Sequence, residues 1–288
     1  MAFLRINRRN FIRLAATAAL GAGAADSLLI EPNTPRVIRK ELALRRWPSR
    51  LDGFTIALLS DFHYDPYFSI HPISRAVRLV NDLHPDLIAL TGDFVSVPWF
   101  GDPAKGASAA EPCARLLQQL KAPHGRWAVL GNHDVFSNPD RVTDALQKAG
   151  IPVLANQSVA VERDGERFWL TGLDDVLGGA ADLQGALHNV PAGEATVLLV
   201  HEPDYADHVA SYPVDLQLSG HSHGGQIKFP FIRPLYLPEL AKKYIWGLYK
   251  IRELTLYTNA GIGTVEVPMR VNCLPEITLF TLRASGNG

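Results

Sequence analysis

Five short apolar runs end abruptly in polar residues, and this recurring junction limits the fold more than any other feature of the sequence. The runs cover residues 54–59, 87–90, 127–130, 197–200 and 214–218, and each has the length of a strand buried on both faces. Helix-like stretches lie between them, which predicts an α/β domain with a largely parallel sheet core. Because ligands bind at the carboxyl ends of strands in such sheets, we expect the five junctions to meet.

Two of the intervening stretches have helical periodicity. Apolar residues share one helical face at positions 73, 76, 77, 80 and 83. They do so again at 142, 145, 146 and 149, where Asn138-Pro139 opens the stretch and Gly150 closes it. The sequence therefore predicts helices that each pack one face against the sheet.

The charge balance and the cysteines exclude several classes of function. With 28 basic and 29 acidic residues the net charge is -1, so no overall field draws the chain to nucleic acid, and we expect no nucleic-acid partner. Cys113 and Cys273 are far apart and form no CxxC motif, which argues against a thiolate zinc site and a disulfide framework. We expect two buried free thiols, with a single disulfide as the alternative.

The side chains at the five junctions are metal donors. They are Asp61, His63, Asp93, Asn132, His133, His201, His221 and His223. Taken singly, each is more often structural, but imidazole, carboxylate and amide together, without thiolate, favour Mn, Fe, Zn, Co or Ni. There are too many donors for one ion, so the set predicts two divalent ions about 3.5 to 4 Å apart with one bridging carboxylate. We expect manganese first among these metals.

The order of the motifs resembles the calcineurin-like metallophosphoesterase superfamily over residues 36–282. The motifs are Asp-x-His at Asp61, Gly-Asp at Asp93, Gly-Asn-His-Asp from Gly131 to Asp134, a lone His201, and Gly-His-x-His from Gly220 to His223. Within the superfamily, the SDFH start, the GHSHGGQI run and the C-terminal tail resemble a small exported or membrane-associated branch. Some of its members hydrolyse phosphodiesters, and others cleave the pyrophosphate of UDP-2,3-diacylglucosamine.

The resemblance implies a fold and a ligand set. The fold would be a four-layer α/β/β/α sandwich of two mixed sheets. One metal would be held by Asp61, His63 and His223, and the second by Asn132, His201 and His221, with Asp93 as the bridge. Position 96 is Ser, where purple acid phosphatases carry a Tyr ligand, which argues against a tyrosinate-iron site.

The resemblance also implies a reaction. A hydroxide bridging the metals would attack phosphorus, His133 would protonate the leaving oxygen, and Asp134 would orient the His133 ring. The expected substrate is a phosphodiester or pyrophosphate, which could be lipid-linked. The alternatives are a UDP-2,3-diacylglucosamine pyrophosphatase of lipid A biosynthesis, a phosphomonoesterase, and last a non-catalytic metal-binding scaffold.

The first 25 residues have the composition of a targeting segment. Arg5, Arg8, Arg9 and Arg13 precede a weakly apolar stretch that ends in small residues, which is typical of a signal peptide. The Arg8-Arg9 pair resembles a twin-arginine export signal, so we expect the export machinery as a partner and a location in the periplasm or on the outer face of the cytoplasmic membrane.

The alternative location is the cytoplasmic side, with the chain held at the membrane by an uncleaved N-terminus. The stretch is too short for the ~20 apolar residues of a spanning helix. The predicted organisation is a signal or anchor at 1–25, a linker at 26–35 and a metallophosphoesterase domain at 36–284.

An aromatic stretch follows the last metal motif. Residues 229–246 interleave aromatic, apolar and basic side chains with prolines. This pattern suits either a lid or membrane-surface contact near Tyr244 and Trp246, or plain core packing, and the two are weighted evenly. Arg270 and Lys228 are weak candidates for binding the substrate phosphate, since lone basic residues are usually solvated.

Overall fold

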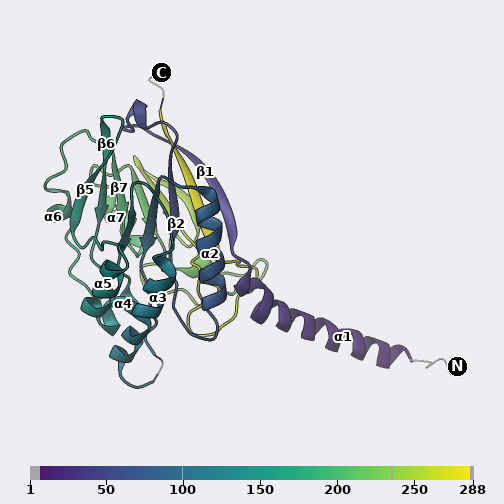
Figure 1. Cartoon of the computed structure of the whole chain (residues 1–288). Coiled ribbons are helices and arrows are strands. Elements are labelled where there is room, and N and C mark those ends of the chain that lie inside the picture. Colours follow the sequence, from purple (N-terminus) through teal and green to yellow (C-terminus); the bar gives the residue numbers. More distant parts are fainter. Residues whose placement is uncertain (1–6, 99, 235, 286–288) are drawn as a thin grey trace.

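The computed structural model describes residues 7–285 except 99 and 235, so Arg5 of the predicted signal and Leu235 of the aromatic stretch lie outside the described residues. Two mixed β-sheets form the body of the molecule (Figure 1). In spatial order, the first contains β1 (Arg36–Leu44), β11 (Glu276–Ala284), β2 (Phe54–Leu59), β3 (Leu87–Thr91) and β4 (Arg126–Val129). The second contains β5 (Gln157–Arg163), β6 (Glu166–Gly172), β7 (Thr196–Leu199), β8 (Leu216–Ser219), β10 (Leu254–Thr258) and β9 (Gly247–Ile251).

The five predicted strands are β2, β3, β4, β7 and β8. Four of them lie inside their sheets, and β4 is an edge strand of the first sheet. In the first sheet β2, β3 and β4 run parallel, and in the second β6, β7, β8 and β10 do. The antiparallel pairs are β11–β2, β5–β6 and β9–β10. The mixed sheets and largely parallel cores confirm the predicted fold class.

Helices cover the outer faces of the sheets. They are α2 (Ile70–Leu83), α3 (Ala110–Leu117), α4 (Asn132–Ser137), α5 (Pro139–Lys148), α6 (Leu183–Leu187) and α7 (Ala206–Val209). Short single-turn or irregular helices complete the chain: η1 (Asp26–Ile30), η2 (Glu31–Asn33), η3 (Ser49–Leu51), η4 (Pro103–Ala109), η5 (Pro203–Tyr205) and η6 (His223–Gly225). The predicted helical faces are confirmed, because Ile73, Ala76 and Val80 of α2 and Val142 and Leu146 of α5 are buried.

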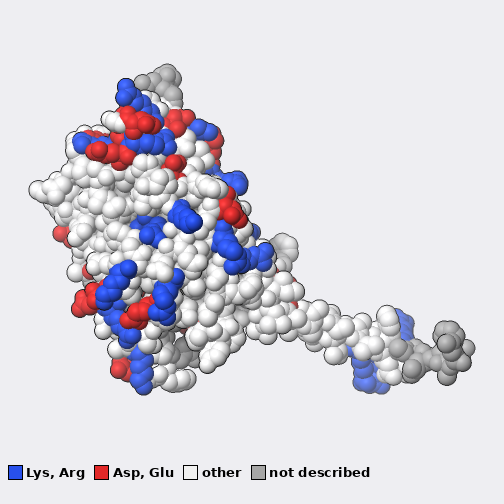
Figure 2. Space-filling view, viewed as in Figure 1, with Lys and Arg blue, Asp and Glu red and all other residues white. Residues whose placement is uncertain are grey.

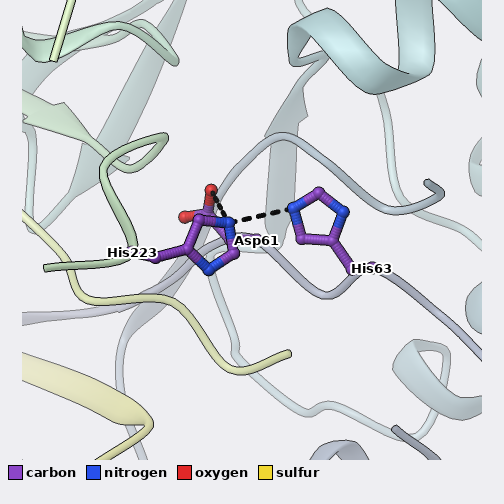
Figure 3. Close-up of side chains that lie close together, drawn as sticks. All are labelled: Asp61, His63 and His223. Atoms are coloured by element: carbon purple, nitrogen blue, oxygen red, sulfur yellow. Dashed lines mark hydrogen bonds and ion pairs between the residues drawn. The ribbon is translucent and has the colours of Figure 1, made fainter. Parts of the chain in front are cut away.

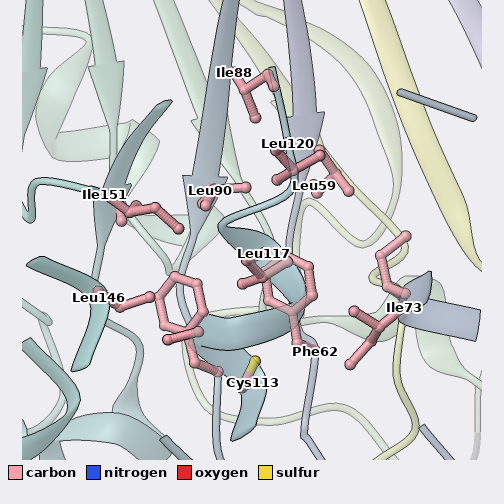
Figure 4. Packing of buried hydrophobic residues seen from close by; sticks show 14 of the residues in the cluster. Leu59, Phe62, Ile73, Ile88, Leu90, Cys113, Leu117, Leu120, Leu146 and Ile151 are labelled. Carbon is pink, nitrogen blue, oxygen red and sulfur yellow. The ribbon is translucent and has the colours of Figure 1, made fainter. Parts of the chain in front are cut away.

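Three apolar layers separate the four layers of secondary structure. The first lies between α2, α3, α5 and the outer face of the first sheet, where Leu59 and Leu90 meet Phe62 and Leu117 (Figure 4). The second lies between the two sheets, and the third beneath α6 and α7. Neighbouring residues of β2 alternate between layers, with Leu58 in the second and Leu59 in the first. This is why all residues of the strand except Thr55 are apolar, and each such side chain contributes about 1.5–3 kcal/mol on burial.

Both cysteines are buried free thiols, which confirms the expectation from the sequence over the alternative of a disulfide. Cys113 lies in the first apolar layer. The Cys273 thiol contacts the carbonyl oxygen of His223 at 3.3 Å. Neither thiol belongs to a group of metal donors among the described residues.

The N-terminal segment is a longer helix than the sequence predicts. Helix α1 (Arg8–Ala25) continues through η1 and η2 to Asn33, and these 26 residues are long and apolar enough, by length and composition, to cross a membrane. The sequence-based expectation that this stretch is too short to span a membrane is therefore wrong by length and composition. Figure 1 shows α1 projecting from the body, and Figure 2 shows it as a largely uncharged rod with basic residues near its outer end.

Residues 26–33, where the sequence predicts a linker, form helical turns that contact the domain. Ser27 and Pro32 are buried. The Glu31 carboxylate accepts hydrogen bonds from the backbone N–H groups of Asn272 and Cys273 at 2.9 and 3.2 Å. The boundaries at residues 25 and 35 stay a prediction.

Sheet topology decides where this helix joins the domain. Strand β1 is parallel to β11, which is antiparallel to β2, so β1 starts at the edge where β2, β3 and β4 end. The helical segment therefore meets the body beside the carboxyl ends of the central strands.

Candidate metal centre

The predicted donors converge at one end of the two sheets. Loops after β2, β3 and β4 supply Asp61, His63, Asp93 and Asn132, and loops after β7 and β8 supply His201, His221 and His223. Donor atoms of Asp61, His63 and His223 lie within 4.8 Å of one another, and so do those of Asp93, His201 and His221. Figure 3 shows the first group, in which the rings of His63 and His223 face each other beside the Asp61 carboxylate.

The arrangement of these atoms fits bound cations. The Nε2 atoms of His63 and His223 are 3.0 Å apart, and His223 Nε2 is 3.4 Å from an Asp61 oxygen. Asn132 Oδ1 and His201 Nε2 are buried and make no hydrogen bond with the described residues. Buried polar atoms without partners are costly, and a divalent metal would satisfy lone pairs that converge in this way. The clustered His and Asp groups are therefore compatible with divalent metal binding.

Hydrogen bonds to the second ring nitrogen orient three of the imidazoles. His201 Nδ1 donates to the carbonyl oxygen of Thr91 at 2.6 Å, and His221 Nε2 donates to that of Glu239 at 2.7 Å. His63 Nδ1 lies 3.0 Å from Ser96 Oγ. Each bond leaves the other nitrogen available to a metal. Sequence analysis missed the two carbonyl partners, because a backbone carbonyl carries no residue-type signal, and it considered Ser96 only as a position without a Tyr ligand.

Charges in the buried cluster are coupled. Burial opposes the charge on both Asp93 and His201, but their attraction outweighs it, so the pKa of Asp93 lies well below its ordinary value and that of His201 well above. Burial lowers the pKa of His221 to about 3, and burial with the nearby His63 ring holds the pKa of His223 well below its usual range. His221 and His223 are thus uncharged at neutral pH, with lone pairs free for a cation.

The backbone of most donor residues is strained. Five of the seven have positive φ, namely Asp61 (52°), His63 (42°), Asp93 (55°), His221 (68°) and His223 (51°). Such conformations are uncommon outside glycine, although Asp and His tolerate them better than most residues, and they gather at functional sites. Tight turns of this kind let neighbouring donors from short loops point to a common centre.

Glycines beside the donors allow the loops to approach closely. A Cβ on Gly131 would overlap the Asp93 carboxylate, and one on Gly220 would overlap Ser60 Oγ and the Asp61 carboxylate. The glycines of the Gly-Asn-His and Gly-His-x-His motifs are thus required by space at the donor cluster.

We expect Gly220→Ala to destabilise the fold by about 1–3 kcal/mol and to weaken metal binding, because the added methyl displaces Asp61. Thermal unfolding and metal content after dialysis measure the two effects. Gly21→Ala, whose Cβ meets nothing within 4 Å, is the matched control and should change neither. Unaltered stability and metal content in Gly220→Ala would contradict the packing argument.

His133 and Asp134 do not pair as predicted. The Asp134 carboxylate accepts three backbone N–H groups, from Phe94 at 2.8 Å, Val95 at 3.1 Å and Gly131 at 3.0 Å. It therefore ties the loop after β3 to the start of α4 and does not orient the His133 ring. Its position in the first turn of α4, where backbone N–H groups are unpaired, explains the difference.

The partner of the His133 ring is a backbone N–H. His133 Nδ1 accepts from Val97 N at 2.9 Å, which leaves the proton of the neutral ring on Nε2. Burial lowers the pKa of His133 to about 4, so the ring is neutral at pH 7. A His133 nitrogen also lies within 4.8 Å of donor atoms of His63 and Asp93. This ring thus adjoins both groups of donors.

The other residues considered from the sequence are not donors at the cluster. Arg270 is fully buried and donates to backbone carbonyls, including that of Gly263, so it is no surface phosphate ligand. Tyr244 packs in the third apolar layer, and Trp246 donates to Glu276 at 2.6 Å. Within the aromatic stretch, Tyr236 lines the hollow above the donors.

The profile of the calcineurin-like phosphoesterases matches residues 54–225, which include all seven donors and His133. The chain belongs to this family. A calcineurin-like metallophosphoesterase acts on phosphoesters, so the family implies a phosphoester substrate and hydrolase chemistry.

Three relatives place this metallophosphoesterase among similar chains. The uncharacterised metallophosphoesterase YkuE of Bacillus subtilis is 35% identical, covering 98% of this chain and 99% of that protein. Phosphodiesterase YaeI of Escherichia coli is 32% identical, covering 96% and 99%. A transmembrane protein with metallophosphoesterase domain from Danio rerio is 31% identical, covering 96% of this chain and 63% of that protein.

Proposed function

We propose that this metallophosphoesterase is a binuclear phosphodiesterase. The observation that carries the proposal is the position of Asp93, whose Oδ2 lies 3.4 Å from His63 Nε2 and 3.1 Å from His201 Nε2. This one carboxylate is within reach of both groups of donors. The relative named phosphodiesterase YaeI, which matches nearly the whole chain, supports a diester substrate.

In the proposed centre, the donors divide into two sets. Asp61, His63 and His223 would hold one ion and Asn132, His201 and His221 the other, and Asp93 lies within reach of both sets. Two divalent ions, manganese first among the candidates, supply Lewis acidity that activates a water and neutralises the phosphoryl oxygens. The buried donors exclude bulk water and keep the lone pairs aimed at one point.

The proposed role of His133 is to assist the leaving group. As the water oxygen bonds to phosphorus, the bond from phosphorus to the leaving oxygen breaks and that oxygen takes up a proton. The attacking water gives up the proton that the leaving oxygen takes up. The neutral His133 ring is placed to donate a hydrogen bond from Nε2–H to that oxygen, because Val97 N–H occupies Nδ1 and the ring lines the hollow above the donors. Asp134 supports the step indirectly, by fixing the start of α4.

Hydrolysis of bis-p-nitrophenyl phosphate beside the p-nitrophenyl monoester tests the proposal, with metal-stripped protein reloaded with Mn²⁺. We expect diester turnover that requires the metal and exceeds monoester turnover. A preference for the monoester would instead identify a phosphomonoesterase. Two bound metals with no turnover of any phosphodiester or pyrophosphate, lipid-linked ones included, would favour a scaffold.

We further propose that the domain works at a membrane surface, held there by α1 after twin-arginine export to the outer face of the cytoplasmic membrane. A hollow lined by Leu28, Leu29, Tyr67 and Phe68 joins the base of the helical segment to the cleft. Further exposed apolar residues follow the last metal motif: Phe229, Phe231, Ile232 and Tyr236. Exposed apolar patches of this kind mark membrane or protein contacts.

A tryptophan probe tests this contact. In full-length Phe231→Trp, we expect the added indole emission to shift to shorter wavelength when phospholipid vesicles are present, because the side chain at 231 is fully exposed and would enter the interface. Leu248→Trp, at an exposed apolar position on β9, is the control and should show no shift. An equal vesicle-induced shift in both variants, or no shift in either, would contradict membrane contact through the residues around Phe231.

A further inference from the structure

The cleft above the donors has an unusual charge distribution. Two adjoining hollows open there, one of about 170 Å³ beside Asn132 and His221 and one of about 440 Å³ beside His63. They share His133 and residues 265–267. Among the described residues that line either hollow, there is no Lys and no Arg. The protein itself thus supplies no cation to bind a second phosphate charge.

The two basic residues nearest in sequence to the residues that line the hollows are Arg270 and Lys228. Both make contacts outside the hollows. The Arg270 guanidinium donates to the carbonyl oxygens of Gly263 and Cys273 beneath the loop. The Lys228 ammonium lies 4.6 Å from the centre of the Trp246 ring. With the proposed metals bound, the ions are therefore the source of positive charge in the cleft.

Three described carboxylates line the hollows: Asp93 in the first, Asp65 in the second, and Glu266 in both. Glu266 is exposed, with φ 63°, at the centre of a three-residue turn in which Val267 N–H donates to Val265 O at 2.7 Å. Turns of this hand are rare and strained for a residue with a side chain. Among the described residues, none forms a hydrogen bond or ion pair with the Glu266 carboxylate.

Gln226, three residues after His223, holds the strained turn in place. Gln226 Nε2 donates to the carbonyl oxygens of Val265 and Val267 at 2.9 and 3.2 Å, and Gln226 Oε1 accepts from Val265 N at 3.0 Å. The segment that carries His221 and His223 therefore also fixes the loop that carries Glu266. Gln226 thus holds the backbone on both sides of Glu266, which keeps this residue at the mouth of both hollows.

We infer that Glu266 selects phosphodiesters whose alcohol group carries an ammonium charge, such as choline or ethanolamine esters; this inference rests on the proposed function. A diester has one negative charge, which the proposed metals would neutralise, and the Glu266 carboxylate attracts the ammonium group. The same carboxylate repels the additional charge of a monoester dianion or a pyrophosphate, with no Arg or Lys in the cleft to offset it. Glu266 is thus a specificity-determining residue.

Two chromogenic diesters with the same leaving group test the inference. Hydrolysis of p-nitrophenyl phosphorylcholine by water breaks the bond from phosphorus to the phenolic oxygen and releases p-nitrophenol and phosphocholine. Methyl p-nitrophenyl phosphate reacts in the same way but has a neutral methyl group. In the Mn-loaded full chain we expect kcat/KM to favour the choline ester by about fivefold, through KM, and this ratio to fall towards one in Glu266→Gln and at high salt.

Glu253→Gln, which removes an exposed carboxylate far from the hollows, is the matched control and should keep the ratio of the unaltered protein. Calorimetric binding of phosphocholine gives a readout without turnover, and we expect it to weaken about fivefold in Glu266→Gln only. Release of phosphocholine from phosphatidylcholine vesicles would show that the choline ester can be a lipid. Turnover of soluble esters alone would show that the substrate is a soluble ester.

The outcomes separate the two proposals. Turnover of both esters at a ratio that Glu266→Gln leaves unaltered would overturn the selection by Glu266 and leave the phosphodiesterase standing. Failure of the metal-loaded protein on both esters, on bis-p-nitrophenyl phosphate and on lipid-linked diesters and pyrophosphates would overturn the proposed function itself.

Discussion

Replacing Asp93 with alanine is expected to release metal and to lower diester turnover by about a thousandfold or more. Asp93 Oδ2 lies within 3.4 Å of His63 Nε2 and 3.1 Å of His201 Nε2, so its loss removes the proposed shared ligand. A metal contributes several kcal/mol to transition-state stabilisation, and each 1.36 kcal/mol is a factor of ten in rate. Metal content after dialysis and turnover of bis-p-nitrophenyl phosphate provide the two measurements.

The loss should spread to neighbouring residues as well. Asp93 Oδ1 accepts the backbone N–H of His133 at 2.9 Å, so the start of α4 loses a hydrogen bond together with the metals. Asp82→Ala removes an exposed carboxylate from α2 and should alter neither metal content nor rate. If Asp93→Ala keeps two metals and full turnover, the shared-ligand assignment is wrong.

Replacing His133 with alanine is expected to keep the metals and to lower turnover by about 10²–10⁴-fold. The ring is outside the proposed ligand set and adjoins both groups of donors, which suits assistance to the leaving oxygen. The loss should be larger for an alkyl leaving group than for p-nitrophenolate, because a poor leaving group depends more on a hydrogen bond to its developing negative charge. Metal analysis and a series of diesters with different leaving groups test both statements.

His188→Ala, which removes an exposed imidazole at the end of α6, is the control and should keep the rate for every ester. Loss of metal in His133→Ala would mean that the ring is itself a ligand. An equal loss across leaving groups would assign it a purely positional role.

Much of the fold was predictable because its strands are buried on both faces. Residues such as Leu58 and Leu59 pack into different apolar layers, so the strand reads as an uninterrupted apolar run that ends where the chain leaves the core. The division of these strands between two sheets was implied by family resemblance, since the runs in β4 and β7 do not differ in a way that assigns a sheet.

The N-terminal segment shows the opposite case. Its small residues and short apolar stretch indicate a signal, yet the chain continues as helix past Ala25, and Glu31 is tied to the backbone N–H of Asn272. These contacts join residues more than two hundred positions apart, and local composition cannot predict them.

The sequence by itself predicted the seven proposed donors and His133, because imidazole, carboxylate and amide after buried strands form a pattern of residue types. Only the tertiary structure decided what orients them. Val97 N–H, and not Asp134, contacts the His133 ring, and Thr91 and Glu239 carbonyls orient His201 and His221. Backbone groups are the same at every residue, so their role depends on how distant loops pack, which residue order alone does not reveal.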